Sequence, residues 1–108
     1  MQKNSSISLT KENIMHKELI TIPRATLDIY YYEQDGLHIY EFDATECSPP
    51  EPMVNTIVVL EMLKNETDIL KVTYFHEPMP LYERIETLFS YEAQELENGN
   101  FLVVFQRK

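Results

Sequence analysis

A helix-forming segment between two strand-forming segments is the feature that most limits how this chain can fold. Residues 37–43 and 69–75 have strand-like patterns, and the segment from about Pro50 to Lys64 between them repeats apolar side chains at helical spacing. The repeat consists of Met53, Ile57, Leu60 and Leu63. Two strands joined through a helix are expected to lie parallel in one sheet, with a right-handed crossover. Ser48 is placed to cap this helix.

The rest of the chain adds a second helix and two further strands. Residues 81–88 carry apolar side chains on one helical face, and strands are expected at 90–96 and 101–105 around a turn at Asn98-Gly99. The order over residues 37–108 is therefore strand, helix, strand, helix, strand, strand. It predicts an α/β fold, more closely an α+β two-layer sandwich with a mixed sheet.

The residues before this domain are also β-like. Residues 26–33 alternate as a strand does, and Asp35-Gly36 is a hairpin signal because both residues tolerate positive φ. We expect an extra N-terminal strand that forms a hairpin with residues 37–43, covers that edge and brings the sheet to five strands. The predicted division is a flexible tail at 1–17, an N-terminal β extension at 18–36 and the domain at 37–108.

Charge and composition exclude several classes of partner. The chain of 108 residues holds 18 acidic and 9 basic side chains, a formal charge of −9. Because clustered Lys and Arg bind nucleic acid and anionic lipid, we expect neither a nucleic-acid nor a membrane partner. The one cysteine, Cys47, cannot close an internal disulfide, which favours a reducing, cytoplasmic setting. No nucleotide fingerprint, phosphate loop or Ser/His/Asp constellation is present, so no cofactor is predicted.

Prolines at the start of the first helix resemble a motif of a known family. In the TusA/SirA sulfur carriers, a strand is followed by a short loop and then by Cys-Pro-x-Pro at the start of the first helix. Here residues 42–44 take the place of the strand end, and residues 50–52 followed by Met53 fit Pro-x-Pro. Residues 77–82 add a second motif, and together the motifs look most like an uncharacterised TusA-like branch. The resemblance covers residues 37–108 and implies a family sheet edge at which partner proteins dock.

The sulfur-carrying cysteine of that family falls on Pro49 here, and Cys47 lies two residues upstream. Free N–H groups and the helix dipole stabilise a thiolate at a helix N-terminus. Pro49 supplies neither sulfur nor N–H, and Glu46 beside Cys47 raises the pKa of a thiol. Cys47 is the catalytic candidate if it carries sulfur or redox chemistry from a shifted position. The alternative is an ordinary loop cysteine.

Two polar residues follow the second strand of the predicted parallel pair. His76 and Glu77 should lie at the same sheet edge as the loop that holds Cys47, the edge where ligands bind in open α/β sheets. Glu46, Cys47, His76 and Glu77 could converge there and include metal-binding types, but no Cys-x-x-Cys or similar spacing is present, so no metal site is predicted. The candidate binding residues are Glu46, Pro49, Pro50, Glu51, Pro52, His76 and Glu77.

Two surfaces indicate contacts with other chains. The 53–63 helix is apolar over more than half of its circumference, so residues 1–22 or a second copy are expected to cover what the sheet leaves open. The 26–40 hairpin carries four tyrosines, which are expected either to pack on the domain and on the N-terminal stretch or, because Tyr is favoured at interfaces, to form a contact surface for a partner. A homodimer through this helix or this hairpin is therefore one hypothesis, and a protein partner is expected in either case.

Three functions remain open from the sequence. The first is a non-catalytic TusA-like domain that acts through protein–protein contacts and is not an enzyme. The second is a sulfur carrier or sulfurtransferase that uses Cys47. The third is a redox- or metal-linked accessory protein, by analogy with relatives of the same branch that are joined to iron-binding domains.

Overall fold

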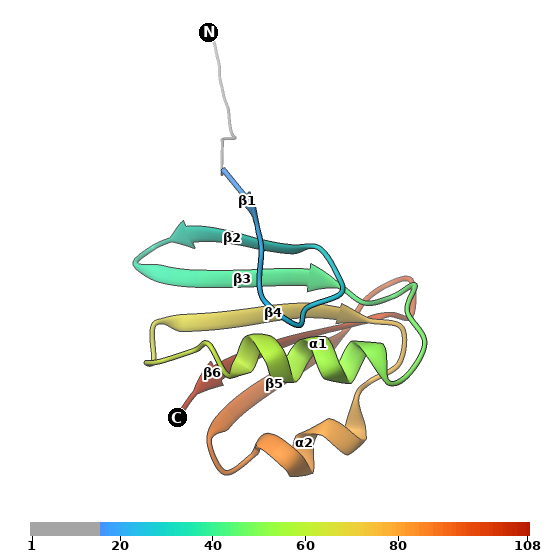
Figure 1. Ribbon diagram of the computed structural model, residues 1–108. Helices are drawn as coiled ribbons and strands as arrows, with labels where there is room; N and C mark the ends of the chain where they lie inside the picture. Colours follow the sequence, from blue (N-terminus) through green and yellow to red (C-terminus); the bar gives the residue numbers. More distant parts are fainter. Residues whose placement is uncertain (1–15) are drawn as a thin grey trace, which may run out of the picture.

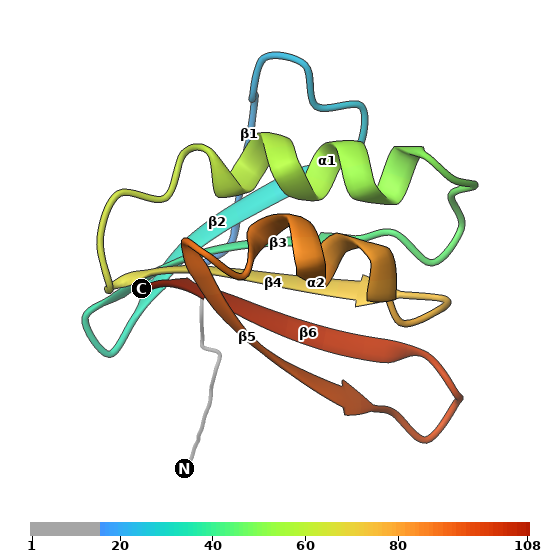
Figure 2. The same ribbon diagram turned by 90° about the horizontal axis from the view of Figure 1, so that it is seen from below.

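The chain folds as one mixed β-sheet with both helices on a single face (Figure 1, Figure 2). A computed structural model describes residues 16–108. The elements are β1 (Glu18–Ile20), β2 (Ile29–Gln34), β3 (Leu37–Asp43), α1 (Glu51–Leu60), β4 (Asp68–Tyr74), α2 (Met79–Ile85), β5 (Phe89–Glu95) and β6 (Phe101–Arg107). The strand order is β1-β2-β3-β4-β6-β5. The predicted α+β two-layer sandwich with a mixed sheet is confirmed.

β3 and β4 form the parallel pair that the helix between them requires. Their register places Ile39 beside Ile69. The remaining pairs, β1 with β2, β2 with β3, β4 with β6 and β5 with β6, are antiparallel. The predicted β2–β3 hairpin is present, and it turns at Asp35 and Gly36, whose φ values are 53° and 79°.

The main core lies between the sheet and the two helices. The sheet contributes fully or almost fully buried side chains from its central strands, and the helices contribute one apolar stripe each. These residues include Phe42, Val59, Leu60, Leu70, Val72, Leu81, Ile85, Val103 and Phe105. Burying one such side chain stabilises the fold by ~1.5–3 kcal/mol. A smaller cluster of Tyr32, Ile39 and Ile69 lies apart from this core.

The segment between β1 and β2 crosses α1 and is held there by a buried amide (Figure 1). Asn55 is 0 % exposed. Its Oδ1 accepts hydrogen bonds from the N–H groups of Thr26 and Leu27, at 2.8 and 3.2 Å. Its Nδ2 donates to the Thr26 hydroxyl at 2.8 Å and to the Glu51 carbonyl at 2.9 Å. We call residues 22–27 the crossing segment.

The crossing segment covers apolar surface of α1 that the sheet does not reach. Ile22 is buried, and Ala25 and Leu27 pack against the same cluster that contains Val58. Val58 is 4 % exposed, whereas Val54 is 44 % exposed. The expected cover by residues 1–22 is therefore found only in part: Ile20 and Ile22 lie in or against this cluster, Ala25 and Leu27 come from beyond that range, and Val54 stays exposed.

Two predictions about the sheet and the start of α1 are wrong. The sheet has six strands rather than five, because Glu18–Ile20 pairs with β2 as a further strand beyond the hairpin. Ser48 does not cap α1 with its side chain. The cap position is Pro50, which has no side-chain donor or acceptor.

Both helices end earlier than their apolar patterns predict. α1 ends at Leu60 and not near Lys64. At Lys64 the chain already turns, because the N–H groups of Lys64 and Asn65 donate to Asp68 Oδ2, at 2.7 and 3.3 Å. α2 ends at Ile85 rather than at residue 88.

Two further predictions concern the N-terminal tail and membrane crossing. The predicted tail, residues 1–17, lies outside the described residues except for its last two, and the proposed division of the chain stays a prediction. Within residues 16–108, no helix combines the length and apolar character needed to cross a membrane.

Candidate functional site

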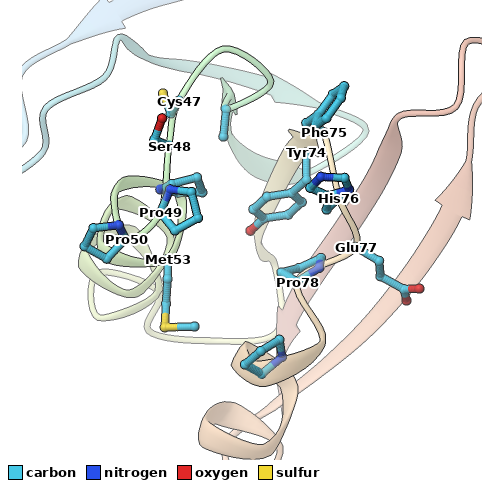
Figure 3. Close-up of a pocket in the computed structure, with 13 residues that line it drawn as sticks. Cys47, Ser48, Pro49, Pro50, Met53, Tyr74, Phe75, His76, Glu77 and Pro78 are labelled. Atoms are coloured by element: carbon cyan, nitrogen blue, oxygen red, sulfur yellow. The ribbon is translucent and has the colours of Figure 1, made fainter.

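A pocket of about 460 Å³ lies between the start of α1 and the loop that joins β4 to α2 (Figure 3). One wall comes from the residues around the start of α1 and the other from the end of β4 and the start of α2. The lining residues are Ala44, Cys47, Ser48, Pro49, Pro50, Pro52, Met53, Tyr74, Phe75, His76, Glu77, Pro78 and Pro80. Five of the chain's six prolines are among them, so we call this cavity the proline pocket.

Sheet topology and turn chemistry bring the two walls together. β3 and β4 are parallel, so the segments that follow them leave the sheet at the same edge. After β3, Asp43 Oδ1 accepts hydrogen bonds from the N–H and the hydroxyl of Thr45, at 2.8 and 2.6 Å, which turns the chain. Pro52 and Pro80 then occupy the first turns of α1 and α2, where a missing N–H costs nothing.

Tyr74 forms the inner wall of the proline pocket and is fixed by two hydrogen bonds in series. Thr56 is fully buried, and its hydroxyl donates to the Pro52 carbonyl oxygen at 2.9 Å. Because that bond uses the only hydroxyl proton of Thr56, the Tyr74 hydroxyl donates in its 2.5 Å bond to Thr56. Burial raises the pKa of Tyr74, so the phenol stays protonated and keeps this role. The end of β4 is thereby tied to the first turn of α1.

The rim of the proline pocket exposes large apolar side chains. Phe75 is 58 % exposed, and its ring meets the ring of His76 edge-on with 4.5 Å between the centroids. Met79 lies between the lining residues Pro78 and Pro80 and is 59 % exposed, but it does not itself line the pocket. Exposed apolar side chains beside a mostly apolar cavity are typical of a contact surface.

Cys47 lines the pocket from the loop before α1 (Figure 3). The carboxylates of Asp43, Glu46 and Glu51 are its charged neighbours. Burial is the largest cause that raises the pKa of Cys47, and the charge and hydrogen bond of Glu51 raise it further. Asp43 and Glu46 act in the same direction. The sulfur is therefore a protonated thiol at neutral pH and not an activated nucleophile.

The start of α1 also offers few amides to an ionised sulfur. Pro49, Pro50 and Pro52 have no N–H group, and the Glu51 N–H donates to the Ser48 carbonyl at 3.0 Å. The feature that activates a thiol at a helix N-terminus is therefore largely missing.

Three carboxylates belong to the segments that form the proline pocket, but none of them points into its interior. Glu46 is exposed on the loop before α1, and Glu51 Oε2 accepts a 2.5 Å hydrogen bond from the Thr26 hydroxyl. Glu77 lines the pocket, but its carboxylate points away from the interior and accepts a 3.0 Å hydrogen bond from Tyr82 (Figure 3). This arrangement suits an apolar side chain that has basic neighbours.

The structure brings together most of the residues that the sequence singled out. The pocket is lined by Cys47, Pro49, Pro50, Pro52, His76 and Glu77, whereas Glu46 and Glu51 do not line it. The suggested convergence of Glu46, Cys47, His76 and Glu77 does not produce a ligand set. In the described part of the chain, no three His, Cys, Asp or Glu side chains come together to hold a metal ion.

In the opposite wall of the pocket, sequence reasoning found His76 and Glu77 but missed the aromatic pair Tyr74 and Phe75. One signal could have found it. Pro78-Met79-Pro80 repeats the Pro-x-Pro pattern of residues 50–52 at the start of the next helix, and only two residues separate it from an aromatic pair at the end of a parallel strand.

Comparisons with known proteins add no relative to this picture. No protein-family model, curated protein or solved structure matches the chain. The geometry of the proline pocket is therefore the basis for any functional assignment.

Proposed function

We propose that this chain is a non-catalytic TusA-like domain that acts in the cytoplasm through protein–protein contacts. The proline pocket receives one apolar side chain of a partner segment, and basic residues beside that side chain face Glu46, Glu51 and Glu77. The observation that carries the proposal is the 460 Å³ cavity with the exposed Phe75 at its rim. Its volume lies within the ~300–1,000 Å³ typical of binding pockets.

The rigidity and charge of the pocket support a protein partner. Prolines fix φ along both walls, so few backbone states are lost when a side chain enters. The net charge of −9 favours approach of a basic partner and disfavours an acidic one. The exposed Phe75 adds apolar area that a partner can bury.

The alternative of sulfur transfer is supported only by the position of Cys47 in the pocket. The raised pKa of Cys47 and the missing amides at the start of α1 both oppose it. A sulfur carrier is often isolated with its persulfide, so the intact mass of freshly purified protein tests this alternative. We expect no added sulfur atom on Cys47.

The proposal is tested by partner capture with matched variants. Wild type, Cys47→Ser, Phe75→Asp and Leu19→Asp are immobilised and incubated with extract of the source cells. Leu19 is a suitable control because it is 59 % exposed, like Phe75, and lies on β1 away from the pocket. We expect the same captured proteins with wild type, Cys47→Ser and Leu19→Asp, and at least a ~tenfold loss with Phe75→Asp, because a buried carboxylate replaces apolar contact.

Two results would contradict the proposal. Capture that is lost with Cys47→Ser would assign the interaction to the thiol and favour the sulfur-carrier alternative. Capture that is equal with Phe75→Asp and Leu19→Asp would show that partners bind elsewhere. Far-UV circular dichroism of each variant confirms that the fold is retained.

A further inference from the structure

A second cavity, of about 430 Å³, lies between α1 and α2. Its α1 side includes Ile57 and Leu60, and its other side includes Ile85 and Leu88 from the end of α2 and the segment after it. Leu88 is 53 % exposed, so the cavity opens to solvent beside an apolar side chain. We call it the interhelical cavity.

The proline pocket and the interhelical cavity lie next to each other, because Met53 of the first contacts Arg84 of the second. We call the two cavities together the groove. Both helices begin at the proline pocket and end at the interhelical cavity, so they flank the groove in the same direction (Figure 2). Met53 lines the first cavity and Arg84 lines the second. The contact that separates the cavities joins these two side chains, with Arg84 Nη1 3.2 Å from Met53 Sδ. Both side chains are long and flexible, so a ligand can displace this contact.

The charge of Arg84 is not neutralised within the groove. A thioether is only a weak acceptor, and no carboxylate of residues 16–108 lies within ion-pair distance of the Arg84 guanidinium. Glu61, the one carboxylate that lines the interhelical cavity, is paired with Arg24 at 2.9 Å. The middle of a largely apolar groove therefore presents a cation that suits a carboxylate.

We infer that an amphipathic helix of a partner protein binds along this groove, with one apolar side chain in each cavity and an Asp or Glu between them facing Arg84. The inference rests on the proposed function and extends it from one side chain to a helix. Met53 and Leu60, one in each cavity wall, are seven residues apart on α1, about 10 Å along the axis. Apolar residues at positions i and i+7 of a partner helix have the same separation, and positions i+3 and i+4 lie between them.

A helix fits this groove better than an extended segment does. Extended ligands are bound through the free backbone groups of a sheet edge, whereas the walls here come mostly from the two helices and the loops next to them. An extended ligand would leave its own N–H and C=O groups unpaired in an apolar groove, while a helix satisfies them internally. The acidic surroundings of the proline pocket also set a direction. The basic end of the partner helix lies at that pocket.

A phage-displayed library of 16-residue helical peptides provides the probe. The library is selected against the wild-type chain, and the enriched peptides are measured by fluorescence anisotropy against Arg84→Glu, Phe75→Asp and Lys64→Glu. Lys64 is an exposed residue that lines neither cavity, so Lys64→Glu controls for the change in net charge. Thermal unfolding checks the fold of each variant.

The expected peptides carry apolar residues at i and i+7 with Asp or Glu at i+3 or i+4. Arg84→Glu should raise their Kd by about tenfold, and replacing the peptide carboxylate by Lys should restore affinity for Arg84→Glu. Lys64→Glu should bind as wild type does. An enriched set without an acidic position, equal binding by Arg84→Glu and Lys64→Glu, or no enrichment would overturn the inference.

The same measurements separate this inference from the proposed function. Peptides that lose affinity for Phe75→Asp but not for Arg84→Glu would support the proline pocket as a binding site and would refute binding of a helix along the groove. Peptides that are insensitive to both variants contradict the proline pocket as well.

Discussion

Replacing Asn55 with alanine tests how firmly the crossing segment is held to α1. The change removes four hydrogen bonds and leaves the N–H groups of Thr26 and Leu27 without their acceptor. Each lost bond costs ~0.5–1.5 kcal/mol net, and a buried group left unpaired costs ~1–3 kcal/mol. Water reaches part of the crossing segment, because Thr26 itself is exposed. We therefore expect the free energy of unfolding to fall by ~2–4 kcal/mol.

Urea unfolding followed by far-UV circular dichroism measures this loss. Val54→Ala is the matched control, because Val54 is the preceding residue of α1 and is 44 % exposed. It should change the free energy of unfolding by less than ~0.5 kcal/mol. The amide of Thr26 should also exchange its hydrogen faster in Asn55→Ala. If Asn55→Ala were as stable as Val54→Ala, the buried amide would not hold the crossing segment, and the reasoning would be refuted.

Three further predictions concern the pocket and its charges. Glu51→Gln should speed alkylation of Cys47 by iodoacetamide near neutral pH, because it removes a negative neighbour that raises the thiol pKa. The control Glu97→Gln should leave the rate unchanged. An unchanged rate in Glu51→Gln would contradict this prediction. Tyr74→Phe should lower the free energy of unfolding by ~1–2 kcal/mol in urea, because the Thr56 hydroxyl loses a donor. Burial raises the pKa of Tyr74 above its unfolded value of ~10. The stability that the protonated phenol contributes is therefore complete below pH ~10 and is lost as pH rises further, at up to ~1.4 kcal/mol per pH unit. In alkaline unfolding, Tyr74→Phe should make this loss of stability smaller.

The element order could be predicted from the sequence because local patterns determine it. The alternation in residues 37–43 and the Asp35-Gly36 signal specified the hairpin, and the helix between two strands specified the parallel pair. The short strand β1 was not predicted as part of the sheet. Three residues of mixed exposure carry little period-2 signal, and β1 pairs only with the outer edge of β2. The end of α1 was missed because Asp68, which lies outside the apolar pattern, accepts hydrogen bonds that turn the chain after the helix.

The candidate site was partly predictable for a related reason. Parallel strands end at the same edge of a sheet, and ligands bind there in open α/β sheets. From this rule Cys47, His76 and Glu77 were expected near one another, and all three line the proline pocket. The role of Asn55 was not visible, because a polar residue within an apolar helical pattern gives no sign of the distant backbone that it binds. Arg84 was missed for the same reason, because the sequence does not show that its guanidinium contacts a thioether and pairs with no carboxylate of residues 16–108.

Site-specific photo-cross-linking tests the central claim most directly. The photoreactive residue p-benzoylphenylalanine is placed at position 75, which lines the proline pocket, or at the equally exposed position 19 on β1. Each position is tested in two backgrounds, the wild-type chain and the Cys47→Ser chain. The account predicts discrete protein adducts from position 75 and none from position 19, with equal yield in the Cys47→Ser background. Adducts that vanish in that background, or that form equally from position 19, would contradict binding through the pocket.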